Sequence, residues 1–131
     1  MHRTFLQLSA LLALFAVALG AIAAHALEHR LSAHYLDVFQ TAARYQMYHA
    51  LALGLVSVIS GRFADKRLIA AGWCFVGGIL IFCGSLYALA LSGVKMLGAI
   101  TPLGGIAFMV GWGLLFLVAR GASDVDRSTG L

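Results

Sequence analysis

Four long apolar segments fill most of the chain and decide which solvent it folds in. They lie at about residues 5–24, 45–61, 68–91 and 100–119. An apolar run of about 18 residues or more is long enough to cross the hydrocarbon core of a bilayer as a helix. Three of these segments reach that length, and segment 45–61 reaches it only if Tyr45, Tyr48 and His49 are included. The sequence therefore predicts a polytopic membrane protein.

The composition supports the same fold class. Hydrophobic residues make up 62% of the 131 positions and charged residues only 11%, whereas a soluble domain is about a quarter charged. We expect an all-α fold, an integral membrane four-helix transmembrane bundle formed by one domain, residues 1–120. Residues 121–131 are polar and lack aromatic side chains, so we expect a disordered cytoplasmic tail.

The basic residues are scattered singly between the segments, which excludes a nucleic-acid-binding stripe. In a four-span topology, one side carries Arg3, Arg62, Lys66, Arg67, Arg120 and Arg127. The other side carries Arg30, Arg44 and Lys95. Because cytoplasmic loops are enriched in Lys and Arg, we expect the first group and both termini to face the cytoplasm.

Two local signals concern helix starts. Ser32 is a suitable N-cap, and apolar residues then recur at helical spacing, which predicts one long helix over 33–60 with an interfacial amphipathic beginning. Thr101 and Pro102 fit an N-cap followed by proline at the first helical position. We therefore expect the last span to begin there.

Polar side chains gather where segment 5–24 ends and the long helix begins. Thr41, Tyr45 and His49 are spaced four apart and share one helix face. If the two helices are antiparallel neighbours, His25 approaches the turn from Tyr45 to His49. Ionisable groups inside a membrane are costly and are candidate functional groups. The candidate polar cluster consists of His25, Thr41, Arg44, Tyr45, Tyr48 and His49.

The favoured interpretation of this cluster is a structural clamp between the first two spans. A proton- or small-solute-handling transporter or channel-like protein is the alternative. A cofactor- or metal-binding redox protein is a second one, because His25 and His29 have the i, i+4 spacing of two metal ligands. No catalytic constellation or phosphate-binding loop can be identified. We therefore predict a non-enzymatic protein, and we assign neither a cofactor nor a metal site.

The last two segments carry small residues at helical spacing. One face holds Ala70, Cys74 and Gly78, and the other holds Gly104, Ala107 and Gly111. Small residues let membrane helices approach closely. We expect these faces to pack on each other or on a second copy. Ile81 and Leu115 are expected to face lipid.

Two motifs resemble a known family. Gly-Ala-Ile-Ala-Ala-His-Ala-Leu at 20–27 is similar to the Gly-Ala-Phe-Gly-Ala-His-Gly/Ala-Leu element of the YgdD-like family. Residues 39–51 resemble its Phe-x-Thr-x-x-x-Tyr-x-x-x-His element. Ile22 and Ala23 depart from the family's Phe and Gly. The resemblance covers the whole length and implies a small four-span protein of the bacterial inner membrane, with mitochondrial relatives and no established activity. The partners we expect are the lipid bilayer and either further copies of the chain or a larger membrane complex.

Overall fold

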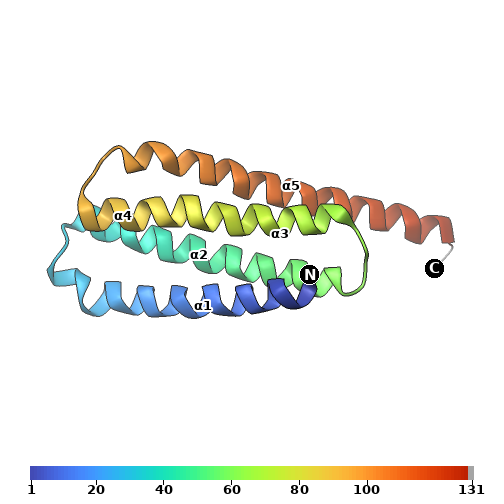
Figure 1. The fold of residues 1–131 in the computed structure, drawn as a ribbon, viewed down its shortest axis with the longest axis horizontal. Coiled ribbons are helices and arrows are strands. Elements are labelled where there is room, and N and C mark those ends of the chain that lie inside the picture. Colours follow the sequence, from blue (N-terminus) through green and yellow to red (C-terminus); the bar gives the residue numbers. More distant parts are fainter. Residues whose placement is uncertain (130–131) are drawn as a thin grey trace.

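The structure is a bundle of four antiparallel rods built only from helices (Figure 1). The computed structural model describes residues 1–129. The first two rods are α1 (His2–His25) and α2 (Ala33–Ser60), with the short 3-10 helix η1 (Leu27–His29) between them. The third rod joins α3 (Lys66–Gly78), the π-helical turn η2 (Ile79–Cys83) and α4 (Gly84–Ser92) without a break, and α5 (Leu97–Thr129) is the fourth. The expected all-α membrane bundle is confirmed.

Helix α2 begins where the sequence predicted. The Ser32 side chain accepts a 3.2 Å hydrogen bond from the backbone N–H of Tyr35, so Ser32 is the N-cap. The helix then continues to Ser60, which confirms the long helix over 33–60. Because its first half is polar, α2 is less apolar than the helices that meet the usual length and hydropathy of a membrane span. By length and apolarity, the spans identified among the described residues are His2–His25, Lys66–Ser92 and Leu97–Gly121.

Helices α1 and α2 pack closely, and hydrogen bonds set their antiparallel register. The hydroxyl of Ser9 donates to the carbonyl of Ala50 at 2.7 Å. The hydroxyl of Ser57 donates to the carbonyl of His2 at 2.6 Å. These bonds satisfy buried hydroxyls where lipid offers no partner, and they align the start of α1 with the end of α2.

The expected start of the last span is wrong. Helix α5 begins at Leu97, and Pro102 lies inside it. The chain already turns before Pro102, because the backbone N–H groups of Leu97, Gly98 and Ala99 bond to carbonyls of the preceding loop. Thr101 therefore does not cap the helix, and its hydroxyl contacts that of Ser85 at 2.6 Å. Proline lacks an N–H, so it forgoes one backbone bond here.

The sequence also predicts a disordered cytoplasmic tail over residues 121–131. The backbone of α5 remains helical beyond Gly121 as far as Thr129. No proline interrupts this stretch, and a long apolar helix precedes it, so the helix only has to be extended and not nucleated. Residues 130–131 lie outside the described residues.

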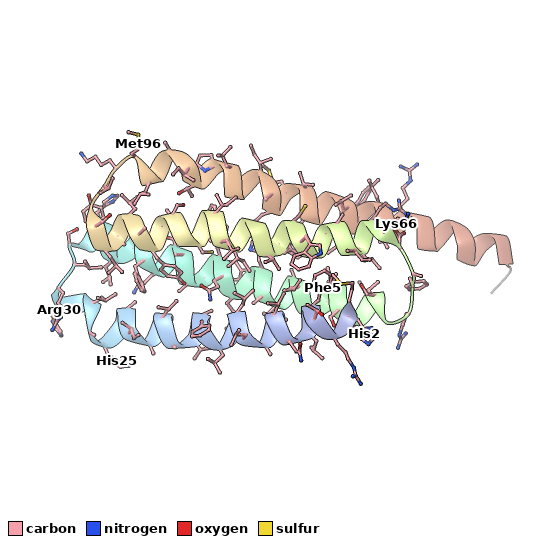
Figure 2. All side chains as sticks on the ribbon, viewed as in Figure 1. His2, Phe5, His25, Arg30, Lys66 and Met96 are labelled. Carbon is pink, nitrogen blue, oxygen red and sulfur yellow. The ribbon has the colours of Figure 1, made fainter. Side chains whose placement is uncertain are left out.

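The termini and the connections between helices lie at the two ends of the bundle. One end holds the N-terminus, the loop between α2 and α3 and the departing C-terminal part of α5 (Figure 1). The opposite end holds the connection from α1 to α2 and the connection from α4 to α5, where Arg30 and Met96 lie (Figure 2). Arg44 lies at neither end of the bundle, because it is near the middle of α2 along the length of that helix.

Candidate functional site

A polar centre lies inside the bundle, and Gln46 is its first member. The Gln46 side chain is 4% exposed. Its Nε2 donates to the carbonyl of Leu12 at 2.8 Å, and its Oε1 accepts from the Tyr87 hydroxyl at 2.8 Å. One amide on α2 therefore joins α1 to α4. A buried amide costs free energy unless it is hydrogen-bonded, and these two bonds meet that demand.

His49 is the second member, one helical turn further along α2. It is 5% exposed. Its Nε2 lies 3.1 Å from the indole Nε1 of Trp112, and its Nδ1 lies 2.8 Å from the carbonyl oxygen of Tyr45. An indole N–H only donates and a carbonyl only accepts. These partners assign the neutral tautomer with the proton on Nδ1.

The His49 ring is also held by aromatic packing. The Phe108 ring stacks on it with centroids 3.5 Å apart and planes 10° apart. Phe75 approaches at 5.7 Å and Trp112 at 6.0 Å. Both ring nitrogens are occupied and one face is covered. The arrangement therefore fixes α2 against α5.

The sequence-predicted cluster divides into separate groups. Tyr45 stacks near His49, with ring centroids 6.1 Å apart, and Tyr48 lies 5.7 Å from Tyr45. Thr41 belongs elsewhere, because its hydroxyl accepts a 3.1 Å hydrogen bond from Arg44. Tyr45, Tyr48 and Arg44 are exposed on the outside of α2. Of the predicted residues, only His49 reaches the polar centre.

The predicted approach of His25 to Tyr45 and His49 is wrong. His25 is the exposed last residue of α1, at the end of the bundle that holds the α1–α2 connection (Figure 2). Helix α2 begins at Ala33, so His49 lies about 24 Å further along its axis. The bond from Ser9 to Ala50 places His49 beside the first half of α1 instead.

Three members of the polar centre were not predicted from the sequence: Gln46, Tyr87 and Trp112. Gln46 precedes His49 by three residues and therefore shares its helix face. That spacing, in an apolar segment, was a usable signal. Tyr87 and Trp112 are 41 and 63 residues from their partners, and no local spacing relates them.

A second polar group lies on the outside of α2. A guanidinium nitrogen of Arg44 is 3.9 Å from a carboxylate oxygen of Asp37, and both side chains are largely exposed. Beside Arg44, a groove of about 340 Å³ runs between α1 and α2. It is lined by Ala16, Gly20, Gln40, Ala43, Arg44 and Met47. We call Asp37, Thr41, Arg44, Tyr45 and Tyr48 the outer face of α2.

Comparisons with known proteins identify the family to which the chain is similar. A family model described as "Protein of unknown function (DUF423)" matches residues 19–105. The UPF0382 membrane protein SAB0533 of Staphylococcus aureus is 47% identical over 115 residues, which cover 88% of this chain and 93% of that protein. The chain belongs to the DUF423 family. The UPF0382 membrane protein YwdK of Bacillus subtilis is 42% identical over 118 residues, 89% of this chain and 96% of its own length. No solved structure gives a significant match.

Membership makes this chain a multi-pass membrane protein of a bacterial family whose function is unknown. The matched region runs from the end of α1 to the first third of α5. It contains Gln46, His49 and Tyr87 of the polar centre and the whole outer face of α2.

In this DUF423 chain, glycines mark the closest contact between the third rod and α5. Gly104 faces the backbone of Phe82, and a Cβ built on Gly104 would lie 2.8 Å from the Phe82 Cα. Gly78 faces the Phe108 ring, and Gly111 faces Phe75. The three predicted glycines therefore lie at the helix contact.

The other residues of the two predicted faces contribute less. Cys74 and Ala107 are half-buried, and Ala70 is exposed. Leu115, expected to face lipid, is buried in the core, whereas Ile81 is exposed. Leu115 follows Gly111 by four residues and therefore shares its buried face, which the expectation of a lipid-facing Leu115 overlooked.

A metal centre receives no support from the described residues, among which no three His, Cys, Asp or Glu side chains gather. His25 ends α1 and His29 belongs to η1, so the two do not share one helix. Both side chains are exposed. The i, i+4 spacing on which this alternative depended is therefore interrupted.

Proposed function

We propose that the protein is a non-enzymatic, self-associating protein of the inner membrane, and that it associates through the outer face of α2. The YgdD-like resemblance fits this proposal, because it implies the same small four-span architecture. The observation that carries the proposal is the position of Arg44, whose side chain is 52% exposed.

Arg44 lies at the depth of the hydrocarbon core. It lines the same groove as Ala16, which is nine residues, or about 14 Å, from the nearer end of α1. Helix α1 is about 36 Å long and the core is about 30 Å thick, so only about 3 Å of α1 extends beyond each boundary. A charge at this depth is covered by protein or by water.

A second copy of the chain offers suitable chemistry. Asp37 and Arg44 carry opposite charges on one face, and their separation of 3.9 Å leaves guanidinium donors for another acceptor. In a twofold dimer the same face meets itself, so Arg44 of each copy can pair with Asp37 of the other. Tyr45 and Tyr48 are exposed residues of the same face, and their hydroxyls can donate and accept hydrogen bonds there.

The geometry of the polar centre favours a structural role over proton transfer. His49 has both ring nitrogens engaged, and Gln46 bonds to two helices. Neither lines the groove between α1 and α2. We therefore assign the polar centre to holding the bundle together and the outer face of α2 to association.

Disulfide crosslinking tests this assignment. In a Cys74→Ser, Cys83→Ala background, Leu51→Cys is expected to form a crosslinked dimer in membranes after oxidation. Leu51 is 62% exposed and lies two helical turns from Arg44 on the same face. Met109→Cys on α5, where the side chain is 66% exposed, is the matched control and should stay monomeric.

The charges should control the same equilibrium. Arg44→Gln is expected to weaken the dimer about 3- to 20-fold, the range of a hydrogen bond between membrane helices. Equal crosslinking from Leu51→Cys and Met109→Cys, or a dimer indifferent to Arg44→Gln, would contradict association through α2.

The orientation in the membrane is a separate prediction. The end that holds the N-terminus carries Arg3, Arg62, Lys66, Arg67 and Arg120, against Arg30 and Lys95 on the opposite connections. The positive-inside rule then places both termini in the cytoplasm. Reporter fusions after Leu131 and after Ser92 should report the cytoplasmic and the external side, respectively. A Leu131 fusion that reports the external side refutes this orientation.

A further inference from the structure

A hollow at the basic end of the bundle has a composition that suits a lipid. It has a volume of about 500 Å³ and lies between the α2–α3 loop, the start of α3 and α5. It is lined by Arg62, Phe63, Ala64, Asp65, Arg67, Val118 and Gly121. We propose that this hollow binds the headgroup of an anionic phospholipid.

The hollow is basic on its rim. Arg62 lies in the loop, and Arg67 reaches over α5, where its Nη2 would lie 3.3 Å from a Cβ built on Gly121. Asp65 offsets part of this charge, because it accepts a bidentate bond from Arg67, at 2.9 Å for the shorter contact. These bonds hold the pKa of the Asp65 carboxyl below its ordinary value. The salt bridge also fixes the Arg67 guanidinium over the hollow.

The surroundings add to the positive charge. Lys66, Arg3 and Arg120 lie at the same end of the bundle. Basic pockets between membrane helices, close to the membrane surface, are suited to acidic headgroups. The charge at this end therefore complements a phosphodiester.

The rest of the hollow is apolar, and this distinguishes a lipid from a free anion. Val118 of α5 is buried in the hydrophobic core. Phe63, in the loop with Arg62, exposes about half of its surface. A phospholipid joins a phosphate to glycerol and acyl chains, so it uses the rim and the apolar wall together. Inorganic phosphate would use only the rim.

The site also has the right depth. Arg67 is the second residue of α3, and the span to which it belongs begins at Lys66. The hollow therefore lies at the boundary between hydrocarbon and water, where lipid phosphates lie. The hollow shares no residue with the outer face of α2, so lipid binding and the proposed association can be tested separately.

Native mass spectrometry of the full chain tests the proposal. The protein is released from micelles that contain equal amounts of phosphatidylglycerol and phosphatidylcholine. The wild type is expected to retain phosphatidylglycerol preferentially. Arg62→Gln, which leaves the bond between Asp65 and Arg67 intact, should reduce that preference about fivefold, since a basic residue near acidic lipid contributes about that factor. Adding Arg67→Gln should reduce it further.

The matched control removes two charges at the opposite end, Arg30→Gln with Lys95→Gln, and should retain the wild-type preference. Excess inorganic phosphate should leave the lipid bound. Equal retention of the two lipids by the wild type, an equal loss in the control, or displacement by inorganic phosphate would each overturn the proposal.

Discussion

Gly104→Ala is expected to lower the free energy of unfolding by about 3 kcal/mol, the upper part of the usual range for overpacking. A Cβ at Gly104 would overlap the backbone of Phe82 and lie 2.7 Å from its Cβ. Backbone cannot rotate away as a side chain can, so α5 and the third rod would have to separate. Reversible unfolding in detergent measures the loss.

Gly105→Ala is the matched control. A Cβ there would meet only the Phe82 ring, at 3.9 Å, which is an ordinary contact. Its effect should stay within about 0.5 kcal/mol. The neighbours Gly77 and Gly78 form a second pair: a Cβ at Gly77 meets nothing within 4 Å, whereas one at Gly78 meets Phe108. Equal losses within either pair would show that glycine acts through helix propensity and not through packing.

His49→Ala is expected to destabilise the protein by about 3 to 5 kcal/mol, the range for removing a large buried ring. The change leaves a cavity beside Phe108 and deprives the Trp112 indole of its acceptor. A buried donor without a partner adds its own cost. The same unfolding measurement provides the readout.

His25→Ala serves as the control, because His25 is exposed at the end of α1. Its effect should stay within about 0.5 kcal/mol. Trp112→Phe separates the hydrogen bond from the ring packing and should cost about 0.6 to 1.7 kcal/mol. If His49→Ala and His25→Ala behaved alike, the polar centre would not stabilise the bundle.

The sequence was sufficient for the fold class because the bilayer imposes it. Backbone groups in lipid must bond within their own segment, so long apolar runs become helices. The Ser32 cap and the glycines at 78, 104 and 111 were also predictable, because each acts through local sterics or local hydrogen bonding. These features need no knowledge of the neighbouring helix.

The site was less predictable because helix rotation is a tertiary property. On a soluble helix the apolar side reveals which residues are buried. On α5 almost every side is apolar, so Trp112 could not be recognised as a partner of His49. The placement of His25 failed for a different reason. Helix α2 starts sixteen residues before His49, and the hydrogen bonds from Ser9 and Ser57 then set a register that polar patterning did not contain.

The π-helical turn at Ile79–Cys83 changes the phase of the third rod. One additional residue in a turn rotates everything after it by about 100° relative to an unbroken α-helix. Side chains beyond this turn therefore do not lie where a regular helical wheel that starts at Lys66 would place them. Beyond the turn, the same rod directs Ser85 toward Thr101 and Tyr87 toward Gln46. A single extra residue thus lets one continuous helix present different faces to different neighbours in its two halves.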